Sequence, residues 1–193
     1  MTRWLSHRMV ERGIIKEEEQ ELYQFGIRNG MILLLNVVTA LVIGLLTEQL
    51  AVVAVFTLSF MVLRSYTGGY HSDSRIFCYL GSNLVLLVPV YTQAVFRKTS
   101  TEWLLAVLLV SAGIIFLLSP MHSKNRKLDK EEQTHFGRKA RLTAALELAV
   151  LGILWHAGQI PYAYAVYTGI CITALFMLVG KAQLWIQSHT ENG

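Results

Sequence analysis

The chain has 193 residues, of which 53% are hydrophobic and only 16% carry a charge, and its net charge is +4. This composition is too apolar for an ordinary water-soluble domain and indicates a chain embedded in a lipid bilayer, with no nucleic-acid partner expected. The two cysteines, Cys78 and Cys171, lie far apart in apolar surroundings, so the sequence does not indicate a disulfide framework.

Residues 1–25 mix apolar and charged side chains before the first long apolar run begins. The charged ones include Arg3, Arg8, Arg12 and Lys16. No short apolar run is followed by a small-residue cleavage site, so we expect no removable signal peptide. The pattern predicts an amphipathic helix lying on the membrane surface, although a solvated helical tail fits it about as well.

Six apolar segments follow, and each is predicted to be a transmembrane helix. They cover residues 27–46, 50–66, 76–96, 103–118, 142–157 and 160–180. Only Thr47-Glu48-Gln49 separates the first two, which predicts a tight helical hairpin, and Pro89 interrupts the third. The second, fourth and fifth are short for a span of about 20 residues, so they need flanking residues or a thinned bilayer to cross.

No internal repeat and no Gly, Ser or Pro-rich linker divides the chain. We therefore expect an all-α polytopic membrane protein in which residues 1–193 form a single membrane-embedded domain. With six crossings, both termini share a side of the membrane with the connections at 64–75 and 119–141. Every Lys and Arg residue except Arg97 and Lys98 lies on that side, so the positive-inside rule places it in the cytoplasm.

The polar stretch from Arg64 to Cys78 separates the second and third apolar segments. An ionised cysteine is a strong nucleophile, and a nearby histidine can take its proton and return it to a leaving amine. In one continuous helix His71 and Cys78 would be about 10 Å apart along the axis, so the chain must bend for them to meet. Ser72-Asp73-Ser74 can cap a new helix, which places Cys78 in its first or second turn, where the helix dipole favours the thiolate.

The same residues also have simpler interpretations. A cysteine on an apolar helix is most often a small buried hydrophobic residue, and a histidine beside a membrane is most often solvated. Arg64 could be an interfacial anchor. Glu147 in the fifth segment is expected either to pair within the helix bundle or to snorkel, rather than to take part in chemistry. Cys171 in the sixth is expected to serve packing, with no titratable neighbour.

Arg64, Gly69, His71 and Cys78, at the start of the third of six apolar segments, form a pattern that resembles the accessory gene regulator B (AgrB) family. The resemblance extends over the whole chain and includes the Pro-then-basic connection at 120–141. It implies a membrane-embedded cysteine endopeptidase of the Gram-positive cell membrane that processes a quorum-sensing propeptide. It also implies Cys78 as nucleophile, His71 as general base and acid, and Arg64 and Gly69 as supports of the active site.

The resemblance further implies a substrate, a short propeptide of the AgrD type with an acidic C-terminal tail. Lys124, Arg126 and Lys127 are the expected contacts for this tail, and a second group of cations at 138–141 has the same chemistry. The head groups of anionic lipid would suit the same cations, and a basic cytoplasmic loop is also what topology alone requires. Cleavage through an acyl-enzyme thioester, followed by exchange with a Cys or Ser of the precursor, would give a thiolactone or lactone autoinducing peptide.

No cofactor is expected, and no His, Cys, Asp or Glu cluster has the spacing of metal ligands. A homodimer is implied by the resemblance only. Two other classes of function stay open. One is a non-enzymatic peptide exporter or membrane scaffold in which His71 and Cys78 only pack, and the other is a cysteine peptidase for soluble substrates that is merely anchored.

Overall fold

The computed structural model describes residues 2–68, 75–121 and 129–190, and within these ranges every regular element is a helix. This confirms the all-α class. The chain packs as two compact units, Met1–Thr39 and Ala40–Gly193. The single membrane-embedded domain over residues 1–193 stays a prediction.

The first unit contains α1 (Thr2–Glu11), the short 3-10 helix η1 (Glu17–Glu19) and most of α2 (Gln20–Leu46). One continuous helix over residues 1–25 is therefore wrong. The chain turns at Gly13, whose φ of 66° is a conformation that glycine adopts without steric cost, and residues 20–25 belong to the same helix as the first apolar segment.

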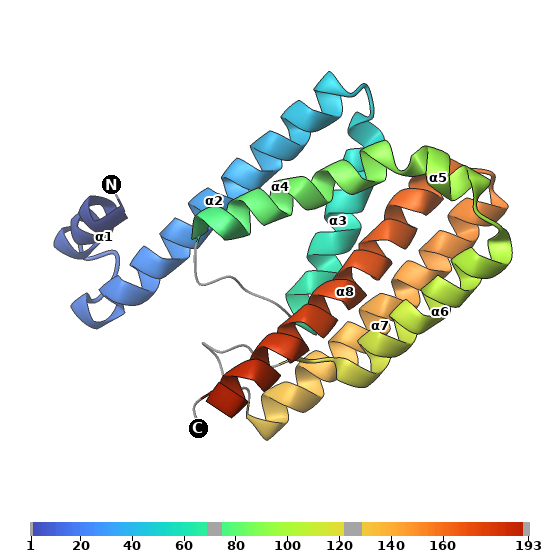
Figure 1. The fold of residues 1–193 in the computed structure, drawn as a ribbon. Coiled ribbons are helices and arrows are strands. Elements are labelled where there is room, and N and C mark those ends of the chain that lie inside the picture. The colour runs from blue at the N-terminus through green and yellow to red at the C-terminus, as the bar shows by residue number, and fades with distance from the viewer. Residues whose placement is uncertain (1, 69–74, 122–128, 191–193) are drawn as a thin grey trace. The chain divides into compact units, whose positions relative to one another are not determined.

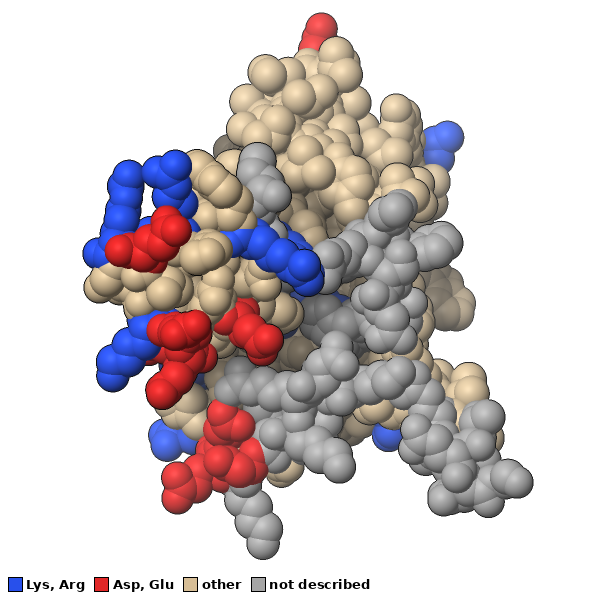
Figure 2. Space-filling model, turned by 90° about the vertical axis from the view of Figure 1, so that its left-hand side faces the viewer, with Lys and Arg blue, Asp and Glu red and all other residues tan. Residues whose placement is uncertain are grey.

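Helix α1 has both apolar and charged residues at its surface. Trp4 is 59% exposed, and the Arg8 guanidinium carbon lies 4.9 Å from the centre of the Trp4 ring, a cation-π contact. In Figure 2 basic and acidic side chains lie next to one another where they gather on the face shown, with no large area of one sign. A position for this unit on the membrane surface stays a prediction.

Helix α8 (Ile160–Thr190) runs through the middle of the second unit (Figure 1). It packs against five other helices: α3 (Leu50–Thr67), α4 (Arg75–Tyr91), α5 (Gln93–Lys98), α6 (Thr101–Leu118) and α7 (Lys130–His156). Its apolar residues are distributed around the whole helix, as expected for a helix covered on all sides. Its most apolar stretch is 61% buried, against 17% for that of α6, so α8 is the central helix and α6 a peripheral one.

Two apolar clusters surround α8, and α3 contributes to both. The first comprises Leu63, Ile115, Ala144, Leu151, Ala163, Val166, Ile170, Ala174 and Met177. The second comprises Ala40, Val52, Val53, Phe56, Leu86, Val90, Ala165 and Ile172. Burial of these side chains stabilises the unit by about 1.5–3 kcal/mol for each large residue removed from water, and by less for those removed only from lipid.

Among the described helices four are long and apolar enough to cross a membrane, namely α2, α3, α6 and α8. Helix α2 ends at Leu46 and α3 begins at Leu50, so the connection between the first two apolar segments is as short as predicted, while the tight hairpin stays a prediction. These helices support a membrane protein. The count of six spans stays a prediction.

The third apolar segment, predicted as one span over residues 76–96, is divided into two helices. Pro89 has no amide hydrogen to donate to the preceding turn, and α4 ends two residues later at Tyr91. Helix α5 begins at Gln93, and its Phe96 packs against Trp155, Tyr164 and Tyr167, with ring centres 6.0, 4.5 and 5.3 Å away. These contacts hold α5 against α7 and α8.

The fifth and sixth segments, predicted over 142–157 and 160–180, lie within longer helices. Helix α7 begins at Lys130, inside the connection predicted to be a loop, because Asp129 and Glu132 form a capping box. The Glu132 amide donates to the Asp129 carboxylate at 2.7 Å, and the Asp129 amide donates to the Glu132 carboxylate at 3.4 Å. The basic residues at 138–141 are therefore helical.

We expect Gly169→Ala to destabilise the protein by about 1 to 3 kcal/mol, because a Cβ at Gly169 on α8 would lie 2.6 Å from Ser59 Oγ on α3. Thermal unfolding in detergent micelles measures this. Gly152→Ala on α7 is the matched control, since nothing lies within 4 Å of a Cβ there, and it should leave stability unchanged or raise it by up to about 1 kcal/mol. Equal unfolding temperatures for the two variants would contradict a close approach of α3 to α8.

Candidate active site

The end of α3 and the connection that follows α6 meet at one end of the bundle. The Met121 amide donates to the Thr67 carbonyl oxygen at 2.9 Å. Gly68 comes next with a φ of 72°, and a Cβ there would lie 2.6 Å from the Met121 carbonyl oxygen. Only glycine fits this position, because any other residue would be strained and would overlap Met121. The two connections that were predicted to share a side of the membrane thus begin in direct contact.

Arg64 lies on the last turn of α3, and its contacts include a backbone carbonyl and an aromatic ring. Its guanidinium Nη1 donates to the Gly68 carbonyl oxygen, which also accepts a bond from Thr67 Oγ1 at 3.3 Å. The guanidinium carbon lies 5.2 Å from the ring centre of Phe176 on α8. A cation that binds the last carbonyl of a helix and an aromatic face is fixed more firmly than an interfacial anchor. This geometry favours a role for Arg64 in steadying the chain where the His71 connection begins.

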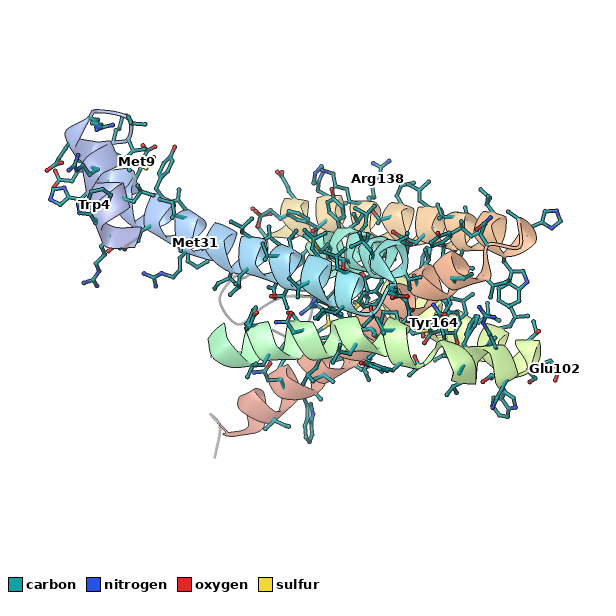
Figure 3. The ribbon with its side chains drawn as sticks, turned by 90° about the horizontal axis from the view of Figure 1, so that it is seen from above. Trp4, Met9, Met31, Glu102, Arg138 and Tyr164 are labelled. Atoms are coloured by element: carbon teal, nitrogen blue, oxygen red, sulfur yellow. The ribbon has the colours of Figure 1, made fainter. Side chains whose placement is uncertain are left out.

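The first turns of α7 pack against the same junction. A Cβ at Gly137 would lie 3.1 Å from Pro120 Cδ, so α7 approaches the chain closely just after α6. Lys139 Nζ lies 5.8 Å from the ring centre of Tyr66 on α3, and Arg141 Nε donates to the Phe116 carbonyl oxygen at 3.1 Å. Arg138 is exposed and extends away from α7 (Figure 3). Of these cations, Lys139 therefore lies beside the end of α3 and Arg141 beside the end of α6.

Helix α4 begins at Arg75, so the backbone of Cys78 lies in the first turn of a new helix. This is the position that a cap at residues 72–74 predicts. The side chain of Cys78 lies outside the described residues, as do the other predicted site residues Gly69, His71, Lys124, Arg126 and Lys127. Their roles stay predictions. Among the residues that are described, no group of three or more His, Cys, Asp or Glu side chains is arranged to hold a metal ion.

Two polar groups inside the bundle have partners that sequence reasoning did not name. Ser59 Oγ on α3 donates to the Glu147 carboxylate on α7 at 2.8 Å, so Glu147 does pair within the bundle. The expectation that Cys171 has no titratable neighbour is wrong, because Cys171 interacts with Tyr167 and with Ser111 on α6. The spacing of Tyr167 and Cys171, four residues apart on one helix, was the signal available in the sequence.

The fold and this junction define a class of protein. It is a helical membrane protein in which the end of one helix, α3 with Arg64 and Gly68, packs against a helix that carries several cations, α7. The chain belongs to the accessory gene regulator B family, whose sequence profile matches residues 1–178. It is similar to two AgrB-like proteins of Clostridium perfringens, from strains SM101 and 13. Each is 24% identical over 148 residues, which cover 72% of this chain and 69% of the relative.

No solved structure gives a significant match to this chain. Membership of the family supports a membrane location and a role in processing the peptide precursor of agr quorum sensing.

We expect Gly68→Ala to separate the two connections, because the added methyl group would overlap the Met121 carbonyl oxygen. The Met121 amide, which is bonded to Thr67, should then exchange its hydrogen about tenfold faster or more in NMR-detected exchange. Gly158→Ala is the matched control, since its φ of 70° imposes the same backbone strain while nothing lies within 4 Å of the added Cβ. Unchanged exchange at Met121 in Gly68→Ala, or an equal change in both variants, would count against this contact.

Proposed function

We propose that this protein is a membrane-embedded cysteine endopeptidase that removes the C-terminal tail of a short quorum-sensing propeptide at the cytoplasmic face of the membrane. The observation that carries the proposal is membership of the AgrB family over residues 1–178, a range that contains Arg64, Gly69, His71 and Cys78. The placing of Cys78 in the first turn of α4 supports it, because that is where a helix favours a thiolate.

In the proposed topology the chain crosses the membrane six times, by α2, α3, α4 together with α5, α6, α7 and α8. Both termini and the connections at 64–75 and 119–141 face the cytoplasm. The hydrogen bond that the Met121 amide donates to the Thr67 carbonyl oxygen supports this arrangement, because it brings the two polar connections to the same end of the bundle. Helix α7 crosses although it carries Glu147, since Ser59 satisfies part of the hydrogen bonding of that carboxylate within the bundle.

The first chemical step is acyl transfer to the enzyme. His71 takes the proton of the Cys78 thiol, and the sulfur attacks the carbonyl carbon at the cleavage site. Amide hydrogens in the first turn of a helix have no partners within the helix, so those of α4 can bind the oxyanion that forms. The C–N bond then breaks, His71 returns the proton to the leaving amine, and the tail departs from a thioester on Cys78.

The second step is cyclisation. His71, now neutral, takes the proton of the thiol or hydroxyl of the precursor's own Cys or Ser, and that sulfur or oxygen attacks the thioester carbonyl. The C–S bond to Cys78 then breaks, which closes a thiolactone or lactone ring and leaves the Cys78 thiolate beside protonated His71. A thioester is open to hydrolysis, so a site that excludes water favours ring closure. A position at the boundary of the bilayer supplies that condition.

Substrate recognition would use charge. The proposed substrate is a propeptide of the AgrD type with an acidic tail, and Lys124, Arg126 and Lys127 are the proposed contacts. Lys139, whose Nζ lies 5.8 Å from the ring centre of Tyr66 on α3, is a further cation near the start of the His71 connection. The cations would hold the acidic tail while the bond before it is cleaved.

Replacing Cys78 by Ala or Ser, or His71 by Ala, is expected to leave a co-expressed precursor at full length, with processing reduced at least about a hundredfold. Immunoblotting of an epitope-tagged precursor measures this. Cys171→Ala is the matched control, because Cys171 is half-buried and interacts with Ser111 and Tyr167, neither of which belongs to the Arg64 junction, and it should process normally.

The same experiment distinguishes the rival functions. A peptide exporter or scaffold would leave precursor processing unaffected by the Cys78 variants, and that result would contradict the proposal. A cysteine peptidase for soluble substrates would cleave a precursor that lacks its amphipathic leader, whereas the proposed enzyme should need the leader to bring its substrate to the membrane.

Six crossings predict which connections reach the outside of the cell. Single cysteines introduced at Thr47, Thr99 and Gly158, in a background without Cys78 and Cys171, should react with a membrane-impermeant maleimide in intact cells. Cysteines at Ser65, Thr134 and Ser188 should react only after the membrane is opened. Labelling of the cysteines at positions 158 and 134 from the same side would show that α7 does not cross the membrane.

A further inference from the structure

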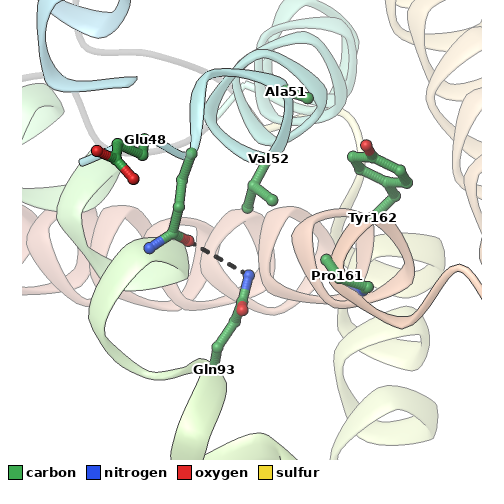
Figure 4. Close-up of a pocket in the computed structure, with 7 residues that line it drawn as sticks. Glu48, Ala51, Val52, Gln93, Pro161 and Tyr162 are labelled. Atoms are coloured by element: carbon green, nitrogen blue, oxygen red, sulfur yellow. Dashed lines mark hydrogen bonds between the residues drawn. The ribbon is translucent and has the colours of Figure 1, made fainter. Parts of the chain in front are cut away.

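A cavity lies at the end of the bundle opposite the Arg64 junction (Figure 4). Its volume is about 260 Å³, and it is lined by Glu48, Gln49, Ala51, Val52, Gln93, Pro161 and Tyr162. These residues come from the α2–α3 turn, the first turn of α3, the start of α5 and the first turn of α8. The 18 residues of α3, at about 1.5 Å each, separate this cavity from Gly68.

The lining combines an apolar part with a polar part. Ala51, Val52 and Pro161 supply aliphatic surface. Gln93 Nε2 donates to Gln49 Oε1 at 3.4 Å, which leaves the amide hydrogens of Gln49 and the carbonyl oxygen of Gln93 available to a ligand. Such a lining suits a molecule with a short apolar chain and a polar end.

Glu48 is the one charged residue among those that line the cavity. Its carboxylate makes no hydrogen bond or ion pair with the described part of the chain. Glu48 also has a φ of 56°, and the other residues with positive φ in the described ranges are the glycines Gly13, Gly68 and Gly158. It follows the end of α2, where the Gln49 amide bonds back to the Gly44 carbonyl oxygen at 2.9 Å and where glycine is least strained.

We propose that this cavity binds a primary ammonium group on a short apolar chain, with Glu48 as its counter-ion. Glu48 is exposed at the edge of the cavity, where no described residue pairs with its carboxylate, so a cationic ligand would meet no competing partner there (Figure 4). The ammonium group would pair with Glu48, the free Gln93 oxygen would accept a second hydrogen bond, and the aliphatic surface would contact the apolar chain. The free amino end of a peptide and the head group of an amine-bearing lipid both have this chemistry. The proposal does not depend on the peptidase function.

The test uses the full chain in nanodiscs of phosphatidylglycerol, with leucinamide as the probe and calorimetric titration as the measurement. Wild-type protein should bind leucinamide and should not bind N-acetylleucinamide, which lacks the charge. Glu48→Gln should weaken binding about tenfold or more. Glu102→Gln is the matched control, because Glu102 is an exposed carboxylate in the first turn of α6 and does not line the cavity, and it should bind as wild type does.

Glu48→Gly separates binding from folding. It should abolish binding, while the thermal midpoint should rise by about 2 to 4 °C because glycine relieves the backbone strain. Nanodiscs that contain phosphatidylethanolamine, a lipid with an amine head group, identify the source of the ligand. If this lipid weakens leucinamide binding, the site takes a lipid head group. If leucinamide binding is unchanged, the site takes the amino end of a peptide. Absence of leucinamide binding by the wild type, or equal binding by Glu48→Gln, would overturn the proposal.

Discussion

Helices α3 and α8 approach each other closely where Gly169 faces Ser59, and the arrangement of the second unit depends on this contact. Without a Cβ at Gly169 the two backbones can come together, and both helices then contribute to the apolar clusters on either side. In a bilayer such packing matters more than in water, because lipid offers apolar side chains the same environment as a protein core. The position of α3 in turn sets the place of Arg64 and Gly68.

Both ends of α8 contribute to features that bear on function. Phe176 contacts Arg64 on the side where the chain enters the connection that contains His71. Pro161 and Tyr162, at the other end, line the cavity beside Glu48. A single central helix therefore fixes the geometry of two separate regions, one facing the proposed substrate and the other facing the proposed ammonium ligand.

Local signals in the sequence predicted a large part of this fold. The lengths of the apolar runs indicated the helical class and a membrane protein, and Thr47-Glu48-Gln49 marked the break between α2 and α3. Ser72-Asp73-Ser74 correctly placed the start of a helix just before Cys78. Each of these features depends on residues within a few positions of one another, which is why a single sequence suffices.

Features that depend on distant residues were not predictable in the same way. Pro89 was visible in the sequence, but α5 forms a separate helix because Phe96 packs on Tyr164 and Tyr167, about 70 residues later. The extension of α7 into the basic connection could have been found from its capping box at Asp129 and Glu132. The partner of Glu147 and the composition of the cavity follow from packing alone.

The bond between Ser59 and Glu147 has a consequence for how the protein is made. Helix α7 carries several charged residues along its length, and a translocon inserts such a segment poorly by itself. Ser59, the partner of Glu147 on α7, lies 88 residues earlier in the chain, so α3 leaves the ribosome before α7 does. On the proposed topology, α3 provides a hydrogen-bonding surface that receives α7 as it emerges, and the order of synthesis becomes part of the assembly mechanism.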